Sequence, residues 1–133
     1  MRIRSLVICL SVVLVLAASG AARAEDVYPN RVIRFIVGFA AGGGNDLFAR
    51  LVVNKFQQNT GATTIVENKP GAGGRISSDY VAHQAPDGYT VLVAATGQMS
   101  IAAAIYPNLT YHPTKSFIPL NMIASFPLML VVP

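Results

Sequence analysis

Hydrophobic runs and glycine-bearing loops alternate along the chain in three similar units. Compact apolar runs bounded by glycine or polar residues are typical of buried strands, which we expect near residues 32–37, 63–67 and 90–94. The intervening patterns predict helices near residues 46–58 and 76–84 and a short helical piece near 100–104. A further apolar run predicts another strand at residues 128–132. Alternation of this kind predicts an α/β fold, a three-layer domain around a parallel sheet with right-handed crossovers.

The first loop joins a strand to a helix through three consecutive glycines, Gly42, Gly43 and Gly44. Glycine adopts backbone conformations that other residues avoid, and it places no side chain in the way of a ligand. The free N–H groups and the positive dipole end of the following helix then point at one place, where an anion can bind. In that helix the apolar residues Leu47 and Leu51 recur four positions apart. The loop is therefore predicted to form half of a binding site for a small carboxylate.

Two more loops follow the second and third predicted strands, at residues 68–74 and 95–98. In open parallel sheets ligands bind outside the carboxyl ends of the strands, where all three loops are expected. The second loop favours a structural turn, with ligand contact as the alternative. Arg75 follows it and could pair bidentately with a distal carboxylate, or it could be a solvated arginine in a first helical turn. Asp46 and Asp79 are interpreted as partners of helix dipoles or as helix caps.

The first 24 residues have the pattern of a secretory signal peptide. Arg2 and Arg4 precede an apolar core at residues 6–18, and Ala22-Arg23-Ala24 forms a small-x-small cleavage site. We expect cleavage after Ala24, which leaves residues 25–133 as the mature chain. An uncleaved membrane anchor is the alternative, but the apolar run is short for a span.

Removal of this leader changes the charge balance. Arg2, Arg4 and Arg23 leave with it, so that seven of the ten basic residues remain against six acidic ones. This balance offers no basic face for nucleic acid, and no nucleic-acid partner is predicted. The only cysteine, Cys9, also leaves with the leader, which excludes a disulfide or a thiolate metal site in the mature chain. The two histidines are isolated from acidic residues and predict no metal site.

The glycine-rich loops do not carry the motifs of nucleotide-dependent enzymes. Gly44 stands where a phosphate-binding P-loop requires lysine, and Ile76 stands where a dinucleotide-binding fingerprint requires its third glycine. No glycine-flanked nucleophile elbow accompanies the serines. A nucleotide-dependent oxidoreductase is therefore the disfavoured alternative, and neither an enzyme nor a cofactor is predicted.

Several motifs in order make the mature chain similar to a known family. They are Tyr28-Pro29, Arg34-Phe35-Ile36-Val37, Phe39-Ala40-Ala41-Gly42-Gly43-Gly44, Ala49-Arg50-Leu51, Val66-Glu67-Asn68-Lys69-Pro70-Gly71-Ala72-Gly73-Gly74, Ala85-Pro86-Asp87-Gly88-Tyr89-Thr90, Tyr106-Pro107 and Phe117-Ile118-Pro119-Leu120. The chain resembles the tripartite tricarboxylate transporter substrate-binding family, the Bug receptors. That family usually has Thr or Ser where this chain has Asn45, and asparagine keeps the capacity to cap a helix.

The resemblance implies a periplasmic receptor that captures a small carboxylate and delivers it to the membrane permease subunits of a tripartite transporter. It implies the amino-terminal lobe of a type II periplasmic-binding-protein fold over residues 25–133. Family members have two lobes, and this chain stops where the crossover into the second should begin, so we expect a truncated fragment. A sensor that binds the same ligands for a signalling partner is the alternative. Dicarboxylates, tricarboxylates, acidic amino acids and aromatic acids all fit the sequence.

The candidate ligand-binding residues come from the three loops, the third of which helps to hold the ligand in the resembling family. The main set is Phe39, Ala40, Ala41, Gly42, Gly43, Gly44, Asn45, Thr96, Gly97, Gln98 and Ser100, and the secondary set is Gly71, Ala72, Gly73 and Arg75.

Overall fold

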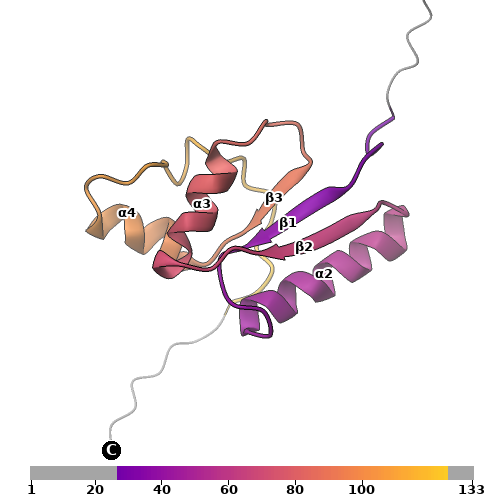
Figure 1. Cartoon of the computed structure of the whole chain (residues 1–133), viewed down its shortest axis with the longest axis horizontal. Helices are drawn as coiled ribbons and strands as arrows, with labels where there is room; N and C mark the ends of the chain where they lie inside the picture. Colours follow the sequence, from indigo (N-terminus) through magenta and orange to yellow (C-terminus); the bar gives the residue numbers. More distant parts are fainter. Residues whose placement is uncertain (1–26, 126–133) are drawn as a thin grey trace, which may run out of the picture. The chain divides into compact units, whose positions relative to one another are not determined.

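The computed structural model describes residues 27–125 of the chain. Its elements are β1 (Ile33–Val37), α2 (Gly44–Thr60), β2 (Thr64–Asn68), the short 3₁₀ turn η1 (Ala72–Gly74), α3 (Arg75–Ala82), β3 (Thr90–Val93), the π-helical segment η2 (Gly97–Ile101) and α4 (Ala102–Ile105), as Figure 1 shows.

The predicted alternation of three strands and three helical segments is confirmed, with boundaries that differ by at most three residues. Two expectations lie outside the described residues, namely the signal peptide and the strand at 128–132. No helix within residues 27–125 is both long and apolar enough to cross a membrane.

The three strands form a parallel sheet in the order β2-β1-β3. The central strand β1 is the most deeply buried, and Ile33, Ile36 and Val37 are at most 1 % exposed. Continuous burial along a strand is typical of a parallel sheet that is covered on both faces. Burial on both faces therefore explains the apolar run from which this strand was predicted.

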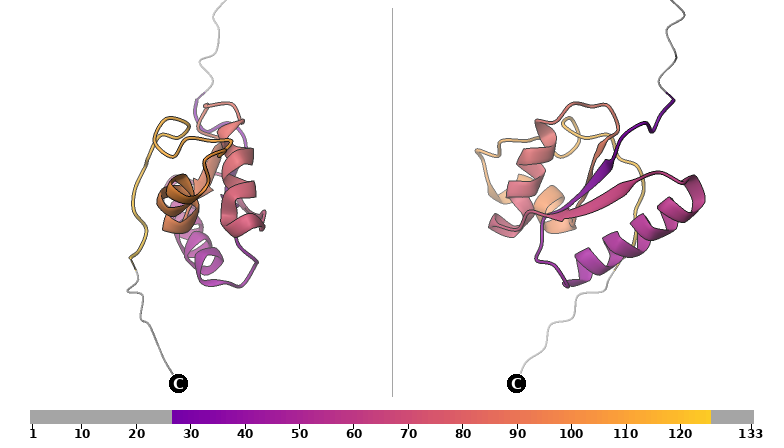
Figure 2. Two further views of the ribbon diagram at one scale, coloured as in Figure 1. Left: turned by 90° about the vertical axis from the view of Figure 1, so that its left-hand side faces the viewer. Right: turned by 45° about the vertical axis from the view of Figure 1, so that its right-hand side comes forward.

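Alternate residues of β1 face different helices, because successive side chains of a strand point to opposite faces. Ile33, Phe35 and Val37 pack in one hydrophobic cluster with Ala49 and Val53 of α2. On the other face the Arg34 guanidinium lies 5.8 Å from the ring of Tyr80 in α3. Figures 1 and 2 show α2 and α3 on opposite sides of the strands. The predicted three-layer arrangement is thus confirmed.

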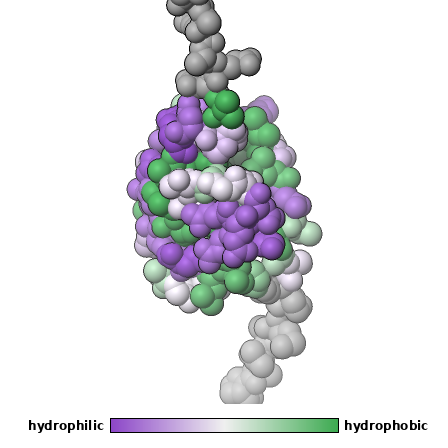
Figure 3. Space-filling model, turned by 90° about the vertical axis from the view of Figure 1, so that its right-hand side faces the viewer, coloured by the Kyte–Doolittle hydropathy of each residue, from purple (hydrophilic) through white to green (hydrophobic). Residues whose placement is uncertain are grey.

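The apolar spacing of Leu47 and Leu51 does not mark the buried face of α2. These side chains are 55 % and 65 % exposed, whereas Asp46, Ala49 and Val53 are buried. The small Ala49 lets the helix approach the sheet closely, and the larger leucines point away from it. Figure 3 shows hydrophobic residues exposed beside hydrophilic ones on one face of the molecule.

Candidate functional site

Three loops leave the carboxyl ends of the strands: loop 1 (residues 38–43), loop 2 (residues 69–74) and loop 3 (residues 94–97). Loops 1 and 2 meet backbone to backbone at Gly38 and Gly74. A Cβ atom on Gly38 would lie only 2.8 Å from the Cα atom of Gly74 and would overlap the Ser77 hydroxyl. Position 38 therefore requires glycine, because the backbones of loops 1 and 2 approach each other closely there. The loops thus lie together at the carboxyl ends of the strands, as predicted.

Gln98, just after loop 3, fills the space between these two glycines. Its side chain is fully buried, and its Oε1 atom would be 3.0 Å from a Cβ on Gly38. Its Nε2 atom donates a hydrogen bond to Ser78 Oγ at 3.1 Å, while Oε1 has no hydrogen-bond partner within the described residues. Its main-chain oxygen accepts a hydrogen bond from the buried Tyr111 hydroxyl. In this conformation Gln98 joins the three loops and is closed to solvent.

The other candidates around loop 3 are open to solvent. Thr96, Gly97 and Ser100 are exposed, and no side chain caps the start of η2. Their hydroxyl and main-chain groups are available to a ligand, in contrast to the amide of Gln98.

Loop 1 is held by a buried carboxylate in the first turn of α2. Asp46 is 2 % exposed, and its Oδ2 atom accepts hydrogen bonds from the Gly42 N–H and from Arg50 Nε, both at 2.9 Å. Its Oδ1 atom accepts one from Asn68 Nδ2 at 2.9 Å, and Asn68 also donates to the Phe39 carbonyl at 3.0 Å. The network connects loop 1, α2 and the end of β2.

The same contacts stabilise the charged form of Asp46. The hydrogen bond from Arg50, followed by those from the Gly42 N–H and from Asn68, holds the pKa of this carboxyl well below its usual range. An acidic residue in a first helical turn also complements the helix dipole, as interpreted from the sequence.

The free N–H groups begin at Gly44, two residues further along than the start of the glycine run. Gly42 donates to Asp46, and Gly43 donates to the Ala40 carbonyl at 3.2 Å. The main-chain N–H groups of Gly44, Asn45 and Asp46 have no hydrogen-bond partner in the described part of the chain, and no side chain caps α2. Because residues 40–44 are exposed, two of these groups adjoin a solvent-open loop at the positive end of a helix of 17 residues.

Loop 2 is a tight turn with an unusual backbone. Gly71, Ala72, Gly73 and Gly74 all have positive φ, at 134°, 48°, 65° and 88°. Such a conformation is disfavoured for an alanine, and it is retained only where the surrounding structure imposes it. The structural turn expected here is therefore present, and Ala72 and Gly73 are exposed on its outer side.

Arg75 begins α3 directly after loop 2 and is half-buried. Its guanidinium carbon lies 3.7 Å from the centroid of the Tyr106 ring. Arg75 is thus a first-turn arginine that keeps partial exposure to solvent, and the ring of Tyr106 covers one face of its guanidinium. Its pairing with a ligand carboxylate stays a prediction. The sequence offered no signal for the contact with the ring, because Arg75 and Tyr106 lie 31 residues apart in the chain.

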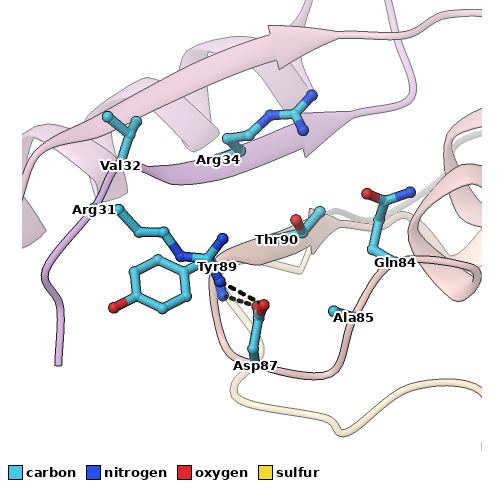
Figure 4. Close-up of a pocket in the computed structure, with 8 residues that line it drawn as sticks. All are labelled: Arg31, Val32, Arg34, Gln84, Ala85, Asp87, Tyr89 and Thr90. Carbon is cyan, nitrogen blue, oxygen red and sulfur yellow. Dashed lines mark hydrogen bonds and ion pairs between the residues drawn. The ribbon is translucent and has the colours of Figure 1, made fainter. Parts of the chain in front are cut away.

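A separate hollow of about 170 Å³ lies at the opposite, amino end of the strands (Figure 4), where Arg31 and Arg34 are among its lining residues. Arg31 pairs with Asp87 at 2.5 Å, and Arg34 makes two hydrogen bonds to the Glu67 carboxylate at 2.6 and 2.8 Å. This bidentate pair raises the pKa of Arg34 and lowers that of Glu67. The hollow lies away from the loops and is not part of the predicted site.

Several residues that shape the site were not predicted from the sequence, because their roles depend on contacts with residues far away in the chain. They are Gly38, Gly74, Asn68, Ser78 and Tyr111. Only Gly38 had a signal in the sequence, because a glycine directly after a buried strand can indicate close packing. No group of three potential metal ligands occurs within residues 27–125.

Residues 48–133 match the family described as the tripartite tricarboxylate transporter family receptor. The chain is 32 % identical to BugT of Bordetella pertussis over 132 residues, which cover 98 % of the chain and 40 % of BugT.

Two solved structures share the fold. The structure of the periplasmic binding protein BugD is 43 % identical, with a TM-score of 0.64 over 68 % of the chain and 30 % of BugD. MatC from Rhodopseudomonas palustris, solved with bound malate, is 38 % identical, with a TM-score of 0.69 over 72 % of the chain and 33 % of MatC.

The chain spans about a third of the length of these relatives. Its sheet and helices are those of the periplasmic binding proteins that it matches, and the relatives are binding receptors. Because the family match covers most of its residues, the chain belongs to the tripartite tricarboxylate transporter receptor family.

Proposed function

We propose that this chain forms the amino-terminal lobe of a periplasmic receptor that captures a small carboxylate for a tripartite transporter. The observation that carries the proposal is the set of unpartnered main-chain N–H groups at Gly44 and Asn45, beside the exposed loop 1. Backbone N–H groups at a helix start bind carboxylates without a charged side chain. MatC, a relative of similar fold, was solved with malate, a carboxylate of this kind.

The proposed contacts come from loops 1 and 3 and the residues that directly follow them. Loop 1 with Gly44 and Asn45 receives the carboxylate, and Thr96, Gly97 and Ser100 supply hydroxyl and main-chain groups from the neighbouring loop. The buried Gln98 and Asp46 hold these loops in place and do not contact the ligand. Export through cleavage after Ala24 and association with membrane permease subunits complete the proposed role. It includes no catalytic step and no cofactor.

The site on this lobe is open, which limits the affinity expected of the chain alone. Tight capture requires that most of the ligand surface be buried, and here the loops form one wall only. A helix-dipole contact with an anion contributes about 0.3–1 kcal/mol when exposed to water. We therefore expect carboxylate binding no tighter than the millimolar range, about −4 kcal/mol in total.

Nuclear magnetic resonance of the ¹⁵N-labelled chain tests this proposal at such affinities. Malate should shift the amide resonances of Gly44, Asn45 and Gly97, whereas the neutral dimethyl ester of malate should not. The amide of Gly61, at the far end of α2, is the internal control. If malate leaves the loop amides unmoved, or moves them no more than its ester does, the proposal is wrong.

A further inference from the structure

The strand β2 forms one free edge of the parallel sheet. It is the outer strand in the order β2-β1-β3, and no strand of the described chain lies beyond it (Figure 1). The Thr63 carbonyl and the Lys69 N–H form hydrogen bonds with β1. Because main-chain groups alternate between the two sides of a strand, those of Thr64, Val66 and Asn68 point to the free edge.

A groove of about 430 Å³ lies beside this edge, between β2 and α2. Arg50 is the only charged residue in its walls, and its charge is balanced by Asp46, which accepts a hydrogen bond from Arg50 Nε at 2.9 Å. The groove therefore presents no unpaired charge to a segment that lies along β2. Besides Arg50, α2 contributes Val53, Asn54 and Gln57 to its walls, and β2 contributes residues 64–66.

This edge has little protection against pairing with another chain. Exposed edge strands commonly carry a lysine, a proline or a bulge that prevents such pairing. Between Thr64 and Asn68 β2 has none of these, and its register with β1 is regular over five residues. Gln57 protects one group, because its Nε2 atom donates a hydrogen bond to the Thr64 carbonyl at 3.2 Å. The main-chain groups of Val66 have no partner on that side within residues 27–125, so the centre of the edge is open to strand addition.

The residues of β2 are complementary to a second copy of themselves. In an antiparallel pair of two β2 strands centred on Val66, Val66 lies opposite its own copy and Thr64 lies opposite Asn68. Because all three residues point their main-chain groups outward, each opposed pair can exchange two hydrogen bonds. The only charged residue of β2, Glu67, lies opposite Ile65, so that no like charges face each other across the strands.

We propose that two copies of the chain pair through their β2 edges, antiparallel and centred on Val66, into a dimer with one continuous sheet. The two-fold axis of such a pair is perpendicular to the sheet, so the two α2 helices lie on the same face of it. The Asn54 side of each α2 then faces the other copy. Because each copy uses the same edge, the pairing is complete with two copies. This inference does not depend on the proposed capture of a carboxylate.

Sedimentation velocity of the exported chain over a range of concentrations tests the proposal. We expect the wild type to change from monomer to dimer as its concentration rises and to form nothing larger. Asn54→Glu places like charges of the two copies across the groove, and it should weaken the dimer by at least about tenfold. Gln58→Glu is the matched control, because it adds the same charge at an exposed position of α2 that does not line the groove. It should leave the dimer unchanged.

Val66→Pro tests the strand pairing itself. Proline removes the N–H at the centre of the proposed pair, and an edge strand tolerates proline where the N–H points away from the sheet. The variant should keep the circular dichroism of the wild type and lose the dimer. If Val66→Pro does not fold, the two glutamate variants decide the question, because both of their positions are exposed.

Four results would overturn the inference. They are a wild type that stays monomeric at every concentration, assembly beyond two copies, equal weakening of the dimer by Asn54→Glu and Gln58→Glu, and a dimer that Asn54→Glu does not weaken. The first of these would mean that another occupant, or none, covers the edge of β2.

Discussion

Gly74 and Gly42 provide a matched pair of substitutions for testing how the loops are packed. Both have left-handed backbones, with φ of 88° and 81°. An alanine in either position costs about 1–2 kcal/mol for the conformation alone. Around Gly42 a Cβ atom meets nothing within 4 Å. Gly42→Ala therefore measures the backbone cost without a packing cost.

At position 74 the new methyl group would collide with Gln98. It would overlap Oε1 and lie 2.8 Å from Cδ and 3.3 Å from Cβ, against an optimal carbon–carbon separation of about 3.5–4.0 Å. Gln98 has little room to retreat, because its side chain is fully buried and bonded to Ser78. Overpacking of this kind costs about 1–3 kcal/mol. We therefore expect Gly74→Ala to lose about 2–5 kcal/mol in total, by adding the backbone cost.

Urea unfolding followed by far-ultraviolet circular dichroism gives the free energy of unfolding of each variant. A third variant, Gln98→Ala, removes Oε1 and Cδ, the two atoms that lie closest to the new methyl group, and leaves only Cβ at 3.3 Å. In the double variant most of the packing cost should disappear, which gives a coupling free energy of about 1–3 kcal/mol between positions 74 and 98. Equal losses for Gly74→Ala and Gly42→Ala, without coupling to Gln98, would refute the packing of the three loops described above.

Three further predictions concern charge and processing. Because the pKa of Asp46 is lowered on folding, the contribution of Asp46 to stability is present above the usual pKa of about 3.9 and is lost as the pH falls below that value. Urea midpoints of the wild type should therefore fall more steeply below about pH 4 than those of Asp46→Asn. Parallel curves for the two proteins would contradict this prediction. Arg34→Lys should cost about 0.2–1 kcal/mol, because the pair is half-exposed and lysine cannot make both hydrogen bonds to Glu67; a double-mutant cycle with Glu67→Gln that gives no coupling would contradict it. Amino-terminal sequencing of the exported protein should begin at Glu25, whereas a membrane-bound chain that begins at residue 1 would show that the leader is an anchor.

The order of elements could be predicted from the sequence because β1 and β3 are short and mainly apolar, and a loop that contains glycine follows each of the three strands. Burial on both faces requires β1 to be hydrophobic at every position except Arg34, which is half-buried and pairs with Glu67, so that its pattern in the sequence is clear. The glycine-rich loops had to follow the strands, because the parallel topology places all three turns at the same edge. These features depend on neighbours in sequence, and local patterns report them well.

The details of the site depend on contacts between distant residues, which local patterns do not report. The run Gly42-Gly43-Gly44 predicted a hinge, but only Gly42 has a positive φ, and Gly43 is extended at φ −73°. Gln98 has a polar amide that could bind a ligand, yet contacts with two glycines from earlier loops bury it. The stack of Arg75 on Tyr106 joins the start of α3 to the end of α4 and had no counterpart in any local pattern.

The buried Asp46 raises the question of how a loop that already holds one carboxylate could bind another. Asp46 accepts the N–H of Gly42, and Asn68 and Arg50 also donate to it. The Arg50 guanidinium balances its charge, so that no net negative charge is added near the helix start. The N–H groups of Gly44 and Asn45 remain without partners in the described chain, and they are fixed in direction because the preceding turn is fixed. An anion that binds them need not order the loop first, and the entropic cost of ordering is part of what weakens binding to flexible sites. We therefore expect the internal carboxylate to favour, not oppose, binding of an external one.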